Sequence, residues 1–243
     1  MRSLNDELAK LEIQNKYSMA FDVGHVGVLG NLGGGSAWDW EDDFSTDKGW
    51  VEVGTQFTID LANDDRLEYA LKRDGSEHEA YVDALGATIS DTAFVFQYHR
   101  VFTGNSSPDS YNKTTVFGLS SVTGGYASTQ DFLGTQLTWG IDDTWSCMSV
   151  NGNDYTYSPF ATSFTTTEDY HVRDIRLSAT SFKSEFFSDA YSSSVEAETI
   201  TINSGVVSLR YPIHMSRGAS TKTEIQNGYS DDFKLADGVT TAP

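Results

Sequence analysis

The chain has 243 residues, of which 38% are hydrophobic and 13% aromatic, and this is enough apolar material for the core of one large domain. It carries 35 acidic against 16 basic side chains, a formal net charge of −19, which argues against binding to the phosphate backbone of nucleic acids. The single cysteine, Cys147, excludes an intrachain disulfide, and no apolar run approaches the roughly 20 residues of a membrane-spanning helix.

Residues 1–16 are predicted to form a short helix. Ser3 can cap it, and Leu4, Leu8 and Leu11 share one face. A helix of this length is marginally stable in isolation, so it either docks on its own domain or acts as an arm that contacts a neighbouring subunit. The N-terminus lacks the apolar core of a signal peptide, so secretion by the usual signal is not expected.

Residues 17–37 have a different character, because glycines separate their apolar residues. Val23, Val26 and Leu29 are interleaved with glycines, and a run of glycines follows at Gly33. This composition predicts an extended arm rather than a folded unit. The arm either lies in a groove on a partner or covers an edge of its own sheet. We therefore divide the chain into an N-terminal helix and arm, 1–37, and a β-rich domain, 38–243.

From Trp40 onward, apolar and polar residues alternate with the period of a β-strand. Turn-forming residues separate many of these runs, and the chain has only 4 prolines to interrupt them. The pattern predicts an all-β, two-sheet antiparallel sandwich. The predicted strands lie in the segments 51–59, 67–71, 92–102, 114–122, 132–141, 145–150, 170–177, 182–187, 195–202 and 206–215.

The two ends of this β-rich region carry similar signatures. Trp40-Glu41-Asp42-Asp43-Phe44 opens the region, and Tyr229-Ser230-Asp231-Asp232-Phe233-Lys234-Leu235 closes it. The shared Asp-Asp-Phe element predicts that the first and last strands lie next to each other in one sheet.

These signatures, together with Gly49-Trp50 and the run from Arg176 to Asp189, carry a family resemblance. From about Trp40 to Leu235 the chain resembles the concanavalin A-like lectin/glucanase jelly rolls, including laminin-G-like modules. Its runs are also similar to those of jelly-roll proteins predicted from archaeal, viral and environmental genomes. The resemblance implies that the predicted sandwich is a jelly roll, whereas it indicates little about function.

The resemblance further implies a structural Ca²⁺ near the point where the first and last strands meet. Calcium binds several oxygen ligands from carboxylates and carbonyls. Asp43 and Asp232 match this place, with Asp42 and Asp231 as alternates. The competing interpretation is that these acids cap strand ends and face solvent.

Catalytic motifs are missing from the sequence. The glucanases of this superfamily use a Glu-x-Asp-x-x-Glu strand motif, which does not occur here, and the nearest acidic alternation, Glu196-Ala197-Glu198, is typical of a solvent-facing strand. There is no Gly-x-Ser-x-Gly elbow, and the five histidines are too scattered to predict a zinc site. We therefore expect no enzymatic activity.

One group of aromatic residues suggests a sugar-binding surface. Trp139 and Trp145 flank a turn, and Tyr155 and Tyr157 alternate soon after it. Aromatic rings stack on the apolar faces of sugars, and polar groups bond the hydroxyls. The competing interpretation is that the rings pack in the core and the loops are simply polar. The polar residues that accompany the group are Asp142, Asp143, Asn151 and Asn153.

Two functions fit these features. The first is a structural or decoration protein of a virion or similar assembly, in which residues 1–37 contact copies of the same chain or other subunits. The second is a lectin-like module that binds glycans for attachment. Both predict a location in a virion or an extracellular assembly. A glycan hydrolase is a distant third.

Overall fold

The structure is a computed structural model that describes residues 38–62, 64–72, 75–105, 113–124, 130–139, 144–152, 154–161, 168–217 and 225–243. The helix predicted over residues 1–16 and the arm predicted over 17–37 lie outside these residues. Within the described part of the chain no helix is long and apolar enough to span a membrane.

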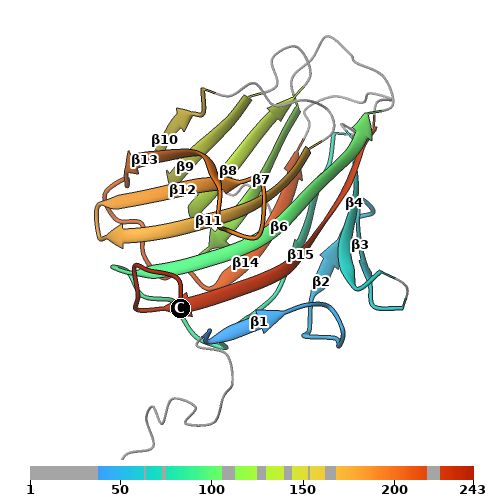
Figure 1. Ribbon diagram of the computed structural model, residues 1–243, viewed down its shortest axis with the longest axis horizontal. Helices are drawn as coiled ribbons and strands as arrows, with labels where there is room; N and C mark the ends of the chain where they lie inside the picture. The colour runs from blue at the N-terminus through green and yellow to red at the C-terminus, as the bar shows by residue number, and fades with distance from the viewer. Residues whose placement is uncertain are drawn as a thin grey trace, which may run out of the picture. The chain divides into compact units, whose positions relative to one another are not determined.

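The described residues form two antiparallel sheets that pack face to face, with the eight-stranded sheet in front in Figure 1. In the eight-stranded sheet, seven strands lie side by side and β1 (Trp40–Asp42) pairs with β15 from outside this order. The seven, in spatial order, are β13 (Ser194–Thr201), β12 (Ser181–Phe187), β11 (Glu168–Ser178), β6 (Phe94–Asn105), β15 (Ile225–Asp237), β4 (Arg66–Lys72) and β3 (Phe57–Asp60).

The seven-stranded sheet forms the second layer. Its strands, in spatial order, are β10 (Asp154–Pro159), β9 (Thr144–Asn151), β8 (Asp131–Trp139), β7 (Lys113–Ser120), β14 (Tyr211–Arg217), β5 (Glu77–Tyr81) and β2 (Val51–Val53). The prediction of an all-β jelly-roll sandwich is therefore confirmed for the described residues.

The first and last strands of the described domain lie side by side, as the repeated Asp-Asp-Phe element predicted (Figure 1). β1 pairs antiparallel with β15, so that Trp40 lies opposite Leu235 and Asp42 opposite Phe233. This contact joins residues almost 200 positions apart in the sequence and thereby closes the domain.

A buried polar and aromatic cluster stabilises this closure. The carboxylate of Asp42 accepts hydrogen bonds from the Phe44 amide at 2.8 Å and from the Trp50 indole at 2.6 Å. The rings of Phe44, Trp50 and Phe233 lie with centroids 5.2–5.6 Å apart. Burial raises the pKa of Asp42, although its hydrogen bonds act in the opposite direction. Asp42 therefore has a structural role.

The main core lies between the sheets, and it contains charge as well as apolar side chains. Arg100 is buried, and its guanidinium lies 3.9 Å from the ring centroid of Trp145 and 4.1 Å from that of Phe117. Cys147 is a buried free thiol, and burial raises its pKa to about 12. A thiol in this state is not a nucleophile.

A second apolar cluster lies on the other face of the seven-stranded sheet. In β14 the side chain of His214 packs against Phe117 in the main core, whereas those of Ile213 and Met215 join the second cluster. Gln130, just before β8, covers part of this second cluster, because its side-chain nitrogen lies 3.7 Å from the sulfur of Met215.

Most strands lie where alternation predicted them, with three exceptions. β5 and β10 were not predicted, and β14 begins at Tyr211 rather than at Val206. Before β14 the chain turns at Ser208, whose φ is +58°, and Arg210 bonds the Ser120 carbonyl. A residue in the left-handed region interrupts a strand, which alternation alone does not reveal.

Candidate functional site

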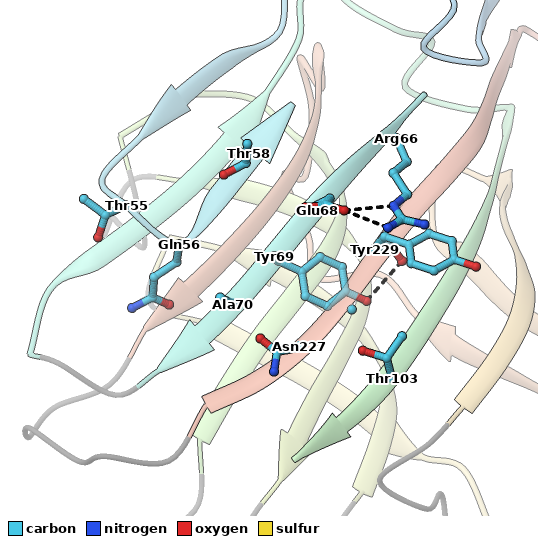
Figure 2. Close-up of a pocket in the computed structure, with 11 residues that line it drawn as sticks. Thr55, Gln56, Thr58, Arg66, Glu68, Tyr69, Ala70, Thr103, Asn227 and Tyr229 are labelled. Carbon is cyan, nitrogen blue, oxygen red and sulfur yellow. Dashed lines mark hydrogen bonds and ion pairs between the residues drawn. The ribbon is translucent and has the colours of Figure 1, made fainter. Parts of the chain in front are cut away.

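A polar cleft of about 230 Å³ lies on the eight-stranded sheet, across the adjacent strands β3, β4, β15 and β6 (Figure 2). The exposed residues of its wall alternate with core residues such as Leu67 and Leu71, so the cleft opens on the face that points away from the other sheet. The lining residues are Thr55, Gln56, Thr58, Arg66, Glu68, Tyr69, Ala70, Thr103, Asn227, Gly228 and Tyr229.

The floor of the cleft depends on Gly228. A Cβ atom there would lie 2.2 Å from the Val101 carbonyl oxygen and 2.5 Å from the ring of Tyr69, so no larger residue fits. The space allows the buried Tyr69 hydroxyl to donate to the Val101 carbonyl at 2.8 Å. Tyr69 is only 3% exposed and its ring packs in the main core against Phe102 and Phe117, so it supports the floor of the cleft from within and presents no open face to a ligand.

A register shift places one wall residue. Asn227 of β15 lies opposite Gly104 of β6, but the next residue, Gly228, lies opposite Phe102. Thr103 thus has no partner across the ladder, as in a β-bulge, and its side chain is exposed at the cleft. Bulges of this kind commonly redirect a side chain toward a functional surface.

Four exposed polar side chains in the lining have no intramolecular hydrogen-bond partner within the described residues. Three are hydroxyls and one is a carboxamide, so together they offer both donors and acceptors. Figure 2 shows that they come from β3, β6, β15 and the segment just before β3. The four are Thr55, Thr58, Thr103 and Asn227. The cleft thus presents neutral hydrogen-bonding groups to a ligand.

An ion pair forms the remaining wall. Arg66 donates to the carboxylate of Glu68 through Nε at 3.1 Å and through Nη2 at 2.7 Å. Its Nη2 also lies 2.8 Å from Asp64, and its guanidinium carbon lies 4.3 Å from the ring centroid of Tyr229. Arg66 is therefore held by two carboxylates and one aromatic face.

A histidine cluster adjoins the Tyr229 side of the cleft. His99 on β6 lies 2.7 Å from Asp231 through Nδ1 and 2.8 Å from Asp169 through Nε2. Its ring stacks on that of His171, with centroids 4.4 Å apart. Burial lowers the pKa of His99, but the bonds to Asp231 and Asp169 raise it by more, to about 8.

The calcium ligands implied by the family resemblance share their cavity with basic residues. Asp43 and Asp232 line one cavity, but Lys48 and Lys234 line it too. The Asp43 carboxylate accepts hydrogen bonds from the amide and hydroxyl of Ser45, which lower its pKa, and Asp232 lies 2.9 Å from Lys234. A cation bound by Asp43 and Asp232 would have to compete with these two lysines, and the assignment of these residues to calcium stays a prediction.

A second acidic group also brings carboxylate oxygens together. Among the described residues, Asp60, Asp64 and Glu68 are the group of three whose carboxylate oxygens all lie within 4.8 Å of one another. The oxygens are of the type that Ca²⁺ prefers. Arg66 contacts two of the three, so a cation there would have to share Asp64 and Glu68 with the guanidinium.

The aromatic group predicted to bind sugars is divided by the fold. Trp145 is only 1% exposed, and its ring packs against Phe186 and Arg100, so this part of the prediction is corrected: the ring has no open face for a ligand. Tyr155 and Tyr157 are 47% and 64% exposed on the edge strand β10. The side chain of Trp139 lies outside the description.

The polar residues predicted with that group also separate. The amide of Asn151 on β9 bonds the Ser204 carbonyl and is therefore committed to the fold. Glu196 and Glu198 on β13, the nearest acidic alternation in sequence, accept hydrogen bonds from the Ala161 amide and the Ser158 hydroxyl respectively. These bonds connect β13 to β10 and to Ala161 just after it, so both carboxylates are used to hold the two strands together. Asp142, Asp143 and Asn153 lie outside the described residues.

The comparisons with known proteins support the fold. Neither a family model nor a curated protein matches the sequence. A protein of unknown function from Shewanella oneidensis MR-1 is similar in structure, with 13% identity, a TM-score of 0.53 and coverage of 84% of this chain and 88% of that one. The CBM2 module of the evolved Dit of Lactobacillus casei BL23 phage J-1 matches with 12% identity, a TM-score of 0.54 and coverage of 83% and 96%.

A third similar structure is the exoplasmic/lumenal domain of VIP36 in its Ca²⁺/Man3GlcNAc-bound form. It matches with 10% identity and a TM-score of 0.50, over 80% of this chain and 86% of that domain. At these identities the likeness concerns the fold, which is a lectin-like β-sandwich.

Proposed function

We propose that the described domain is a non-catalytic module that binds a glycan in the cleft between β3, β4, β15 and β6. The observation that carries this proposal is the set of four exposed hydroxyl and carboxamide groups in the lining, which have no hydrogen-bond partner among the described residues. Saccharide hydroxyls are recognised by such neutral donors and acceptors. The buried Tyr69 hydroxyl is hydrogen-bonded to the backbone of β6 and fixes the strands beneath the cleft, so the site needs little ordering when a ligand binds.

The likeness to a CBM2 module and to a domain bound to Man3GlcNAc supports this proposal at the level of fold. The absence of catalytic chemistry is part of the proposal. Arg66 holds Glu68 in an ion pair at 2.7 Å, so the carboxylate that lines the cleft is already committed to a cation.

The test is to measure glycan binding by the full-length protein and by Thr103→Ala, which removes one unpaired hydroxyl without touching the core. Thr199→Ala is the matched control, because Thr199 is an exposed threonine on β13 at the other edge of the same sheet. We expect Thr103→Ala to weaken binding by about tenfold, as the loss of a ligand hydrogen bond does, and the control to bind normally. No binding to any glycan, or equal binding by both variants, contradicts the proposal.

We also propose a second function, as a subunit of a virion or similar assembly, because the similar CBM2 module belongs to a phage Dit protein. In this role the sandwich is a rigid block and residues 1–37 contact other copies. The full-length protein should then have a solution mass of more than one chain at micromolar concentration. A single-chain mass at all concentrations would count against self-assembly.

A further inference from the structure

The charge around the cleft limits which glycans it can accept. The chain as a whole carries a formal net charge of −19, so any anionic ligand approaches against a long-range repulsion. A site that binds anions overcomes this repulsion with free arginine or lysine side chains. Among the described residues that line the cleft, Arg66 is the only cation.

Arg66 is not free to receive an anion. Its Nη2 contacts both Asp64 and Glu68, its Nε contacts Glu68, and one face of the guanidinium is stacked over Tyr229. A ligand carboxylate would have to displace these partners, and the displaced carboxylates would remain next to it. Asp60 adds a third negative group, because its oxygen lies within 4.8 Å of those of Asp64 and Glu68.

The opposite side of Tyr229 is no more favourable to an anion. The cation on this side is His99, whose ring centroid lies 6.0 Å from that of Tyr229. Both of its ring nitrogens are already bonded, one to Asp231 and the other to Asp169. These two carboxylates also act on the Tyr229 hydroxyl: burial raises its pKa, and Asp231 and Asp169 raise it further. Lys72, the next basic residue along β4 after Arg66, also has an interaction partner and is not free for an anion. The described surroundings of the cleft thus combine committed cations with excess carboxylates.

From this arrangement we infer that the cleft selects uncharged saccharides and discriminates against those that carry a carboxylate or sulfate group. The inference rests on the proposed glycan-binding function and specifies its ligand class. Neutral sugars need only the hydroxyl and carboxamide groups of the wall, for example Thr103 and Asn227, and they leave the Arg66 ion pairs intact.

The test uses immobilised oligosaccharides in matched pairs: lactose and N-acetyllactosamine, each beside its sialylated and its sulfated form. We expect the full-length protein to bind the charged member of each pair at least about tenfold more weakly, and the ratio to approach one as salt is raised, because screening acts on repulsion. Glu68→Gln and Asp64→Asn each remove one charge but keep an oxygen to accept from Arg66, so both should reduce the ratio.

Asp154→Asn is the matched control. It removes one charge from an exposed residue on β10 of the other sheet and should leave the ratio unchanged. Equal or stronger binding of the charged member by the wild-type protein would overturn the inference while leaving glycan binding intact. A failure of every neutral and charged glycan to bind would instead reject the proposed function itself.

Discussion

The His99 cluster should make the stability of the domain depend on pH in a predictable direction. The pKa of His99 is raised from 6.5 to about 8 by the hydrogen bonds to Asp231 and Asp169, which outweigh its burial. A group with a higher pKa in the folded state stabilises the fold fully below its unfolded pKa. That contribution is lost as the pH rises through the folded pKa. The stabilising window therefore lies below 6.5, and the loss occurs between 6.5 and about 8.

The size of the effect follows from the shift. A difference of 1.5 pKa units, at 1.36 kcal/mol per unit, corresponds to about 2 kcal/mol of unfolding free energy. The His99 side chain is only 16% exposed, but Asp169 is 74% exposed, so solvent screens its share of the effect and about 2 kcal/mol is an upper value. His171 reduces the observable effect, because its pKa is lowered by burial and then by the charge on His99. When the charge on His99 is removed, His171 is protonated more readily and partly replaces His99 as the titrating group.

The assay is urea unfolding of the wild-type protein and His99→Gln from about pH 6 to pH 9.5, with the two free energies subtracted at each pH. We expect the wild type's advantage to shrink by up to about 2 kcal/mol across this range. Titration by nuclear magnetic resonance should show that Asp231→Asn lowers the His99 pKa more than Asp169→Asn, because Asp169 is 74% exposed and Asp231 28%. A stability difference that stays constant with pH would refute the reasoning.

Three further predictions concern the closure, the cleft and calcium. Asp42→Asn replaces one of two buried acceptors by a donor, so urea unfolding should show a loss of about 1–3 kcal/mol, and a loss near zero would contradict its structural role. Gly228→Ala forces a Cβ against the Tyr69 ring and should cost about 1–3 kcal/mol and weaken glycan binding, whereas unchanged stability would show that the floor can shift. Calcium should raise the melting temperature of the wild type and of Asp43→Asn but not of Asp60→Asn, and an unchanged shift in Asp60→Asn would exclude the acidic group.

Alternation predicted the sandwich because long strands that are half buried must repeat every two residues. β4 and β6 have clear alternation, and both were predicted near their observed positions. β10 was missed because its exposed Tyr155 and Tyr157 suggest a binding loop when the edge position of the strand is unknown.

The candidate site was not predictable from local sequence. The cleft joins strands far apart in the chain, and its shape depends on the shift in pairing at Asn227 and on the missing side chain of Gly228. Its functional groups are short hydroxyl and amide side chains, which carry no motif. The Gly228-Tyr229 pair inside the long strand β15 was the one available signal, since a glycine in a strand often marks a bulge or a close approach.

The error at Trp145 has a related cause. Its predicted role required the ring to face outward, and the deciding neighbour is Arg100, which occupies an inward position on β6 where alternation favours an apolar residue. A buried guanidinium needs large aromatic faces around it, and Trp145 supplies one of them. Trp145 therefore faces the core, where Phe102 and Phe186 also pack against its ring, and alternation within its own strand does not reveal these neighbours.

The most conspicuous motif of the sequence is architectural, and the proposed binding chemistry lies elsewhere. In the first Asp-Asp-Phe element, Asp42 bonds Trp50 and Phe44 packs on its ring. In the second, Phe233 packs on the same ring while Asp232 pairs with Lys234. The two elements are similar because both build one closure. The closure uses the Asp-Asp-Phe residues themselves, whereas the cleft in which we propose that a glycan binds is lined by other residues of the eight-stranded sheet.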